Sequence, residues 1–290
     1  MIGHHSIYLV MDFLEHDLKT LLEDMVEPFL PSETKTLMLQ IVSATEHLHS
    51  HWILHRDLKT SNLLMNNRGE IKLADFGMAR YTASQPPKLT QLVVTLWYRS
   101  PELLLGAETY GSEIDVWSVG CIFGELLTKD PLFQGKNEVD QLSKIFASLG
   151  TPTKDSWPDF RSLPNAKALH PLLSSAPAKQ PQSQLSFPYL TQSGLRLLTS
   201  MLSLNPSTRP TASEILQHPY FKEDPRPKAK EFFPTFPSKA GQEKRRKRET
   251  PNAPLRGEKA PALGAEDFAK EIFAGREMEE RGGGFALRLG

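Results

Sequence analysis

Periodic hydrophobic positions along the chain predict a mostly helical domain. From Pro31-Ser32-Glu33 to Leu48, apolar residues recur at three- and four-residue intervals, which predicts an amphipathic helix with one buried face. Residues 113–128 are almost continuously apolar, which predicts a helix buried on most sides at the centre of the domain. The same helical periodicity covers residues 18–25, 138–149, 191–202 and 211–216.

A smaller part of the chain has the pattern of β-strands. Apolar runs at 63–65 and 71–74 flank the turn-forming residues Asn66-Asn67-Arg68-Gly69, so these segments predict a β-hairpin. Residues 7–13 form another β-rich run and predict a strand that leads into the first helix. Helices and strands together indicate an α+β fold.

The composition of the chain changes after Phe221. Beyond that residue the sequence is rich in Pro, Lys, Arg, Glu and Gly and has few periodic apolar positions. Such segments bury too little apolar surface to offset the entropy of ordering. We therefore expect a folded domain over residues 1–221 and a disordered tail over residues 222–290.

Charge and cysteine content exclude several classes of protein. The chain has 34 Lys and Arg against 34 Asp and Glu, so its net charge gives no sign of a nucleic-acid partner. No apolar run reaches the roughly 18 residues that a membrane helix needs, and the N-terminal stretch lacks the basic start of a signal peptide. The single cysteine, Cys121, lies in an apolar stretch, which predicts a buried thiol in a reducing compartment.

Two polar motifs carry the chemistry of phosphoryl transfer. In His55-Arg56-Asp57-Leu58-Lys59, with Asn62 five residues after Asp57, the spacing is that of the protein kinase catalytic loop. Asp57 is expected to accept the proton of the substrate hydroxyl, and Lys59 suits the charge that develops on the transferred phosphate. Asn62 and the Asp75 of Asp75-Phe76-Gly77 offer hard oxygen ligands for Mg²⁺.

Two structural motifs follow these in the order that kinases have them. Ser100-Pro101-Glu102 stands where kinases end the activation segment with Ala-Pro-Glu, and Asp115 opens Asp115-Val116-Trp117-Ser118. A buried Glu102 needs a cationic partner, for which we predict Arg209. Each motif alone is compatible with an ordinary turn, but the ordered set predicts a protein kinase that uses ATP and Mg²⁺.

Longer phrases of the sequence resemble those of cyclin-dependent kinases, above all the PITSLRE subfamily. The resemblance is carried by residues 93–99, 149–158, 15–19, 52–57, 118–128, 233–237 and 284–287. It implies a proline-directed serine/threonine protein kinase with a role in transcription, RNA processing or the cell cycle. Protein substrates and a cyclin are the partners that it implies, with no direct nucleic-acid partner and no membrane.

The resemblance also implies a nucleotide site. It places Met11 at the back of the adenine pocket, Asp12 and Leu14 as backbone hydrogen-bonding partners of adenine, Asp17 at the ribose, and Leu64 and Ala74 on the pocket floor, and it adds Thr95 to the catalytic residues. The alternative is that Met11 and Leu64 belong only to the hydrophobic core.

Thr90 occupies the activation-loop position that kinases of this type phosphorylate. A phosphate there would bind Arg56 and Arg80 through charge-assisted hydrogen bonds and order the loop. The alternative is an ordinary loop threonine. Val93, Val94 and Arg99 resemble the pocket that favours proline after the phosphorylated residue.

The resemblance further implies which part of a kinase the sequence contains. Met1 aligns at or just before the last strand of the small lobe, so no glycine-rich loop or phosphate-binding strand lysine precedes the motifs. We expect a hinge, a helical large lobe and a tail, with the small β-lobe mostly absent and cyclin docking weakened. The alternative function is therefore a weakly active or inactive kinase lobe that serves as a binding scaffold.

Two further sequence features leave alternatives open. His47, His49, His51 and His55 have helical spacings that would suit a metal site, although the glutamate of the zinc-hydrolase pattern is missing. The basic run at residues 244–248 is either a nuclear localisation signal or a solvated charge run. The resemblance to nuclear kinases favours the nucleus, with the cytoplasm as a second location.

Overall fold

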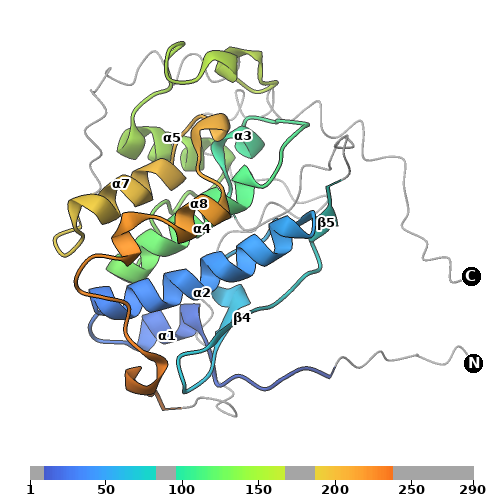
Figure 1. Cartoon of the computed structure of the whole chain (residues 1–290). Coiled ribbons are helices and arrows are strands. Elements are labelled where there is room, and N and C mark those ends of the chain that lie inside the picture. Colours follow the sequence, from blue (N-terminus) through green and yellow to red (C-terminus); the bar gives the residue numbers. More distant parts are fainter. Residues whose placement is uncertain (1–9, 83–95, 167–186, 238–290) are drawn as a thin grey trace, which may run out of the picture.

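Helices are the main regular structure in the part of the chain that the computed structural model describes, which is residues 10–82, 96–166 and 187–237 (Figure 1). The helices are α1 (Leu18–Asp24), α2 (Pro31–Ser50), α3 (Pro101–Leu104), α4 (Glu113–Thr128), α5 (Glu138–Leu149), α7 (Gln192–Met201) and α8 (Ala212–Leu216). The strands are β1 (His16–Asp17), β2 (Ile53–Leu54), β3 (Leu63–Met65), β4 (Ile71–Leu73) and β5 (Arg80–Tyr81). The helical predictions of the sequence are confirmed to within two residues at each end.

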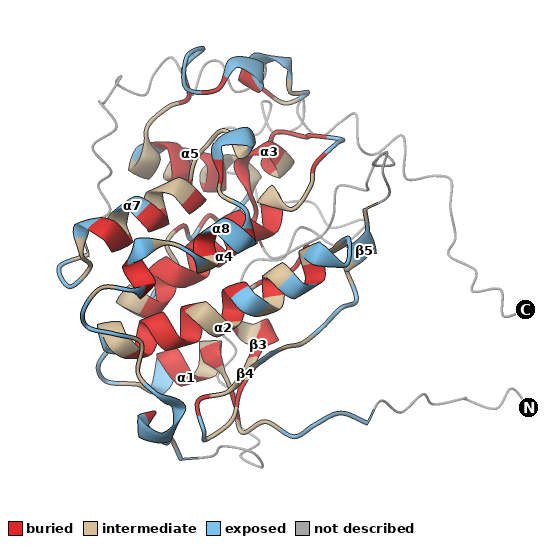
Figure 2. Ribbon diagram, in the orientation of Figure 1, coloured by how far each residue is buried: buried red, intermediate tan, exposed pale blue. Residues whose placement is uncertain are grey.

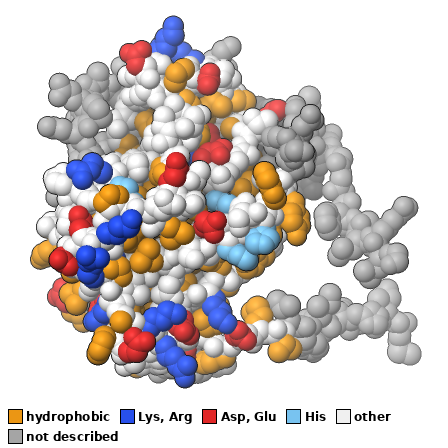
Figure 3. All heavy atoms as spheres, viewed as in Figure 1, with side chains coloured by type: hydrophobic (Ala, Val, Ile, Leu, Met, Phe, Trp, Pro, Cys, Tyr) orange, Lys and Arg blue, Asp and Glu red, His pale blue; other side chains and the backbone are white. Residues whose placement is uncertain are grey.

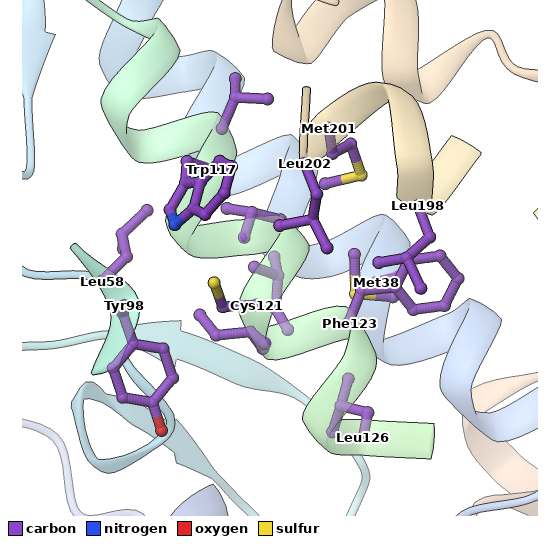
Figure 4. Close-up of a cluster of buried hydrophobic side chains, with 14 of the residues drawn as sticks. Met38, Leu58, Tyr98, Trp117, Cys121, Phe123, Leu126, Leu198, Met201 and Leu202 are labelled. Atoms are coloured by element: carbon purple, nitrogen blue, oxygen red, sulfur yellow. The ribbon is translucent and has the colours of Figure 1, made fainter. Parts of the chain in front are cut away.

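Helix α4 is the centre of the hydrophobic core. Every residue from Ile114 to Leu126 is buried, and Figure 2 shows this helix red along nearly its whole length. Its side chains meet those of α2 and α7 in one cluster (Figure 4). A Cβ atom added at Gly120 would lie 2.9 Å from Leu202 Cδ2, so this glycine permits the close approach of the α7 end. Cys121 is buried in the same cluster, as predicted.

Helix α2 has the amphipathic character that its sequence predicts. Pro31 stands at its first position, and the Glu33 carboxylate accepts the Leu30 backbone N–H at 2.9 Å, which satisfies one N–H at the helix start. Leu37, Met38 and Ile41 are fully buried against α4 and α8. In this part of the chain, local sequence and tertiary packing agree.

Strands of two small antiparallel sheets lie just before and after the catalytic loop and the Asp75-Phe76-Gly77 motif. β1, β3 and β4 form one sheet in that order, and β2 pairs with β5 in the other. The predicted hairpin is confirmed as β3 and β4, joined by a turn in which Gly69 has φ of 71°. The predicted strand at residues 7–13 is wrong in its described part: residues 10–13 have no regular structure, and Val10 is 95% exposed. The reason is that β3 pairs instead with His16–Asp17, and a strand needs a hydrogen-bonded neighbour.

The chain after Phe221 differs from the predicted tail. Residues 222–237 pack against α2 and the hairpin, and Phe233 is a buried member of the main core. The composition predicted disorder here because the few aromatic residues that attach this segment to the core do not form a periodic apolar pattern. The rest of the predicted tail, residues 238–290, lies outside the described residues. Within the described ranges, no helix combines the length and apolar character needed to cross a membrane.

Candidate active site

The catalytic loop begins directly after β2, and hydrogen bonds to Asp115 of α4 hold its backbone in place. The Asp115 carboxylate accepts the backbone N–H groups of His55 at 2.9 Å and Arg56 at 2.8 Å, and it lies 3.0 Å from His49 Nε2. Arg56 has φ of 69°, a backbone conformation that side-chain-bearing residues rarely adopt. Because both bonds end on a buried charged oxygen, they offset the strain and hold this conformation.

The loop brings the predicted catalytic residues together. Lys59 Nζ donates to Asp57 Oδ2 at 2.8 Å. Asn62 Nδ2 donates to the Asp57 carbonyl at 2.8 Å and to Oδ2 at 3.2 Å. Asp57 is only 6% exposed, so little water competes for its carboxylate. The Lys59 ammonium and the Asn62 amide therefore hold this carboxylate in one orientation.

Asp75 is joined to this loop through its neighbour Ala74. The Ala74 N–H donates to the Asn62 carbonyl at 2.9 Å, and its own carbonyl lies 3.2 Å from His55 Nε2. The Asp57 N–H donates to His55 Nδ1 at 3.3 Å, which leaves the imidazole proton on Nε2 for Ala74. These bonds place the exposed Asp75 carboxylate beside the loop, with φ of 63° at Asp75 itself.

The donor set around Asn62 and Asp75 fits a hard divalent cation. The Asn62 amide nitrogen is engaged by Asp57, so the amide oxygen is the atom that can ligate a metal. Asp75 supplies a carboxylate, and an Asp75 oxygen accepts the Gly77 N–H at 3.2 Å. Oxygen donors of this kind suit Mg²⁺, which keeps several of its ligands as water or phosphate oxygens.

Of the residues predicted to bind the nucleotide, Asp17 and Leu64 lie in the first sheet and the others lie in the segments beside its strands. Asp17 of β1 stands opposite Leu64 of β3, and the Asp17 carboxylate also caps α1 by accepting from the Thr20 N–H and hydroxyl, both at 2.9 Å. Met11 is 67% exposed and Leu64 is half-buried, so neither is part of the buried core. The exposed Asp12 forms an ion pair with Lys72, which lowers the pKa of Asp12. Leu14 and Ala74 are half-buried. The nucleotide-binding roles stay predictions.

The sequence pattern of the protein kinase domain matches residues 2–221. The chain belongs to the protein kinase family. It is 59% identical over 243 residues to the serine/threonine-protein kinase ppk23 of Schizosaccharomyces pombe, a match that covers 83% of this chain and 60% of that protein. It is 45% identical over 288 residues to cyclin-dependent kinase 11B of Mus musculus, covering 98% of this chain and 36% of the relative.

A solved structure agrees with this assignment. The crystal structure of the yeast RNA Pol II CTD kinase CTDK-1 complex contains a chain that matches with a TM-score of 0.71 and 38% identity, over 75% of this chain and 71% of that one. The protein kinase fold and the resemblance to cyclin-dependent kinases are thus confirmed. The kinase chain spans 60% and 36% of the two curated relatives above.

The predicted regulatory arginines of the kinase lie close to each other. Arg56 is buried with its guanidinium 5.7 Å from the centre of the Tyr110 ring, and β5 places Arg80 opposite Leu54. Burial lowers the pKa of Arg56, and the neighbouring positive charge of Arg80 acts in the same direction. Thr90 and Thr95, together with Val93 and Val94, lie outside the described residues.

The predicted pair of Glu102 and Arg209 is confirmed in the kinase. Arg209 Nη1 and Nη2 donate to the two Glu102 oxygens at 2.7 and 2.8 Å, and Nε donates to the Ser203 carbonyl at 2.8 Å. The guanidinium also lies 5.0 Å from the centre of the Trp117 ring. This buried bidentate pair fastens the start of α3 to the segment before α8.

The four histidines of the alternative metal site have other contacts in the kinase. His49 contacts Asp115 and His55 contacts Ala74, while the rings of His47 and His51 lie 4.4 Å apart on the exposed face of α2. Among the described residues, no group of three or more His, Cys, Asp or Glu side chains is arranged to hold a metal ion. The structure therefore adds no support for this alternative.

Sequence reasoning missed a buried polar network beneath the catalytic loop of the kinase. The Thr60 hydroxyl donates to Glu125 Oε1 at 3.0 Å and lies 3.0 Å from the Tyr98 hydroxyl, which donates to Glu125 Oε2 at 2.7 Å. Burial raises the pKa of Glu125 to about 7. The available signal was a carboxylate, Glu125, that follows nine residues of α4 without a charged side chain. The network joins the catalytic loop, α4 and the segment that precedes Ser100.

Proposed function

We propose that the chain is the catalytic lobe of a serine/threonine protein kinase that transfers the γ-phosphate of ATP to protein substrates. The observation that carries the proposal is the arrangement of Asp57, which is oriented by Lys59 and Asn62 and lies beside the Asp75 segment. Kinases stabilise a loose transition state mainly by positioning and charge, and this arrangement supplies both.

Each residue has a distinct part in the proposed reaction. Asp57 accepts the proton of the substrate hydroxyl, because its carboxylate is buried and held at one position. Lys59, paired with Asp57 at 2.8 Å, neutralises charge that develops on the transferred phosphate. Asn62 and Asp75 would hold Mg²⁺, which, when bound, screens the charge of the ATP phosphates.

We propose serine or threonine followed by proline as the phosphorylation site, with a cyclin as partner. The cyclin partner is supported by the relative named cyclin-dependent kinase 11B, and the preference for proline rests on the predicted pocket of Val93, Val94 and Arg99. Arg99, the described residue of the predicted proline pocket, is buried and held by Glu138 at 2.5 Å. Its fixed side chain gives that pocket a rigid wall.

The test is transfer of radiolabelled phosphate from ATP to a Ser-Pro peptide and to the matching Ser-Ala peptide. Both the chain alone and the chain fused behind the glycine-rich lobe of a related kinase are assayed. Asp57→Asn should cut turnover by about 100- to 10,000-fold, the contribution of a general base, while nucleotide binding persists. Glu23→Gln, at an exposed position on α1, is the matched control and should leave turnover unchanged.

Three outcomes would each contradict a part of the proposal. Equal transfer by Asp57→Asn and the unmodified fusion would remove Asp57 from its assigned role. Nucleotide binding without transfer in the unmodified fusion would favour the scaffold alternative. Equal rates on the Ser-Pro and Ser-Ala peptides would refute the preference for proline.

We also propose that the basic run at residues 244–248 directs the protein to the nucleus. A fluorescent fusion of the chain should accumulate in nuclei, and replacing the run by alanines should release it into the cytoplasm. Unchanged nuclear accumulation after that replacement would refute the role of the run.

A further inference from the structure

The chain continues beyond the matched kinase domain as an ordered segment, residues 222–237, which we call the C-terminal strap. In Figure 1 it is the orange segment that leaves α8 and runs past the start of α2. Lys35 of α2 is fully buried, and its Nζ donates to the carbonyls of Glu223 and Pro225, each at 2.9 Å. The Thr36 hydroxyl donates to the Lys228 carbonyl at 2.7 Å. The first half of the strap is thus anchored on α2 by polar groups of the helix.

The second half of the strap packs on the turn between β3 and β4. Phe233 is 6% exposed and lies directly over Gly69, where an added Cβ atom would come within 2.5 Å of its ring. The rings of Phe233 and Phe236 each lie 6.1 Å from the ring of Phe29. The strap therefore joins the hydrophobic core, and the hairpin turn is shaped to receive it.

The end of the strap touches β1. Asn67 Oδ1 accepts the Phe236 backbone N–H at 3.3 Å and lies 3.1 Å from His16 Nε2. The rings of His16 and Phe236 meet edge to face, with centres 6.1 Å apart and planes at 82°. His16 is only 8% exposed, so the turn and the strap together enclose its side chain.

This contact lies one residue from the predicted ribose site. His16 precedes Asp17, and β1 pairs His16 with Met65 and Asp17 with Leu64. β1 has only two residues, so its own ladder holds it weakly, and the contacts of His16 add to the restraint that comes from the Asp17 cap on α1. A shift of β1 would move Asp17 and Leu64 relative to each other, and both belong to the predicted nucleotide site.

We propose that the C-terminal strap positions the nucleotide site, with Phe236 as the positioning residue that holds His16 and therefore β1 in place. This inference rests on the proposed function, because it concerns the binding of ATP. Phe236 contacts the rings of His16 and Phe29, neither of which is a predicted nucleotide residue, and acts on the nucleotide site through His16. Figure 3 shows acidic and basic side chains interspersed on this face of the molecule, and the strap itself forms ion pairs, Lys228 with Glu33 at 2.8 Å and Lys230 with Glu70 at 3.4 Å.

The test compares three variants of the full chain. Phe236→Ala removes the contact with His16. Phe232→Ala is the matched control, since Phe232 is a strap phenylalanine that is 73% exposed. Phe233→Ala removes the core anchor and reports the effect of a general loss of stability. For each variant, the affinity for Mg-ADP, the thermal midpoint and the hydrogen exchange of backbone amides in residues 16–20 and in α4 are measured.

Phe236→Ala removes the ring contacts with both His16 and Phe29, and the lost His16–Phe236 pair should weaken the affinity for Mg-ADP by about three- to tenfold. Amide exchange should rise in residues 16–20 and stay unchanged in α4. In the fused protein, the KM for ATP should rise by the same factor while the KM for the peptide and kcat stay unchanged. Phe232→Ala should match the unmodified chain in every measurement.

Unchanged affinity and unchanged exchange in Phe236→Ala would overturn the inference. A loss of affinity accompanied by faster exchange in α4, as expected for Phe233→Ala, would also overturn it, because the role of Phe236 would then be only structural. If neither the unmodified chain nor the fused protein binds nucleotide, the proposed function fails, whereas unchanged exchange in residues 16–20 of Phe236→Ala marks the failure of this inference. The exchange measurement distinguishes the two failures, since it reports whether Phe236 holds β1 without any nucleotide.

Discussion

Glu125→Gln should change how the stability of the kinase depends on pH. Glu125 is 2% exposed in the last turn of α4, and its two oxygens accept hydrogen bonds from Thr60 and Tyr98 at 3.0 and 2.7 Å. Glutamine has nearly the same shape and keeps an oxygen for the Tyr98 hydroxyl, while its amide group can donate to Thr60. The substitution therefore removes the titration and retains most of the network.

The magnitude follows from the pKa in the two states. Burial raises the pKa of Glu125 from its usual 4.5 to about 7 in the folded protein. A raised pKa means that the protonated carboxyl favours folding, so the stabilisation is complete below pH 4.5 and is lost as the pH rises through about 7. Between pH 5 and pH 8, this loss amounts to about 2 to 3 kcal/mol of the free energy of unfolding.

The assay is urea denaturation at half-unit steps from pH 5 to pH 8. The difference in free energy of unfolding between the unmodified chain and Glu125→Gln cancels every other titrating group. That difference should move in favour of the variant by about 2 to 3 kcal/mol as the pH rises across this range. Glu23→Gln, with an exposed carboxylate on α1, serves as the control and should follow the pH profile of the unmodified chain.

A difference that is flat from pH 5 to pH 8 would refute the reasoning, because Glu125 would then titrate alike in the folded and unfolded chain. A difference that moves in the opposite direction would mean that the hydrogen bonds from Thr60 and Tyr98 outweigh burial and stabilise the carboxylate.

Three other substitutions test separate parts of the structure. Arg209→Ala leaves Glu102 buried without its bidentate partner and should cost about 3 to 5 kcal/mol in urea denaturation; a loss below about 1 kcal/mol would contradict the role of the pair. Asp115→Asn weakens the acceptor that holds the Arg56 backbone, so kcat of the fused kinase should fall more than its KM for ATP rises, and a change in KM alone would contradict this. Thr90→Ala should lower activity by removing the proposed phosphate from the arginines, and peptide mapping that finds no phosphate on a fully active protein would refute this switch.

The amino-acid sequence was sufficient for the features that depend on neighbouring residues. The periodicity of α2 and α4 is a local property, because the side chains that share a helical face are three or four positions apart. The spacing between Asp57 and Asn62 is likewise local, since one tight loop brings both side chains together. The hairpin turn at Gly69 could be predicted for the same reason.

Other features were decided only by the tertiary structure, because they depend on which distant segments pack together. Lys35 and Glu223 are 188 positions apart. No periodic pattern in the sequence predicts that a lysine on α2 will donate hydrogen bonds to carbonyl groups of the strap. Glu125 is an isolated acid in the sequence and becomes part of a network only where α4 passes beneath Thr60 and Tyr98. Burial of apolar surface is non-directional, so it favours a compact chain without specifying these partners, which are selected by the hydrogen bonds and shapes that meet in the folded state.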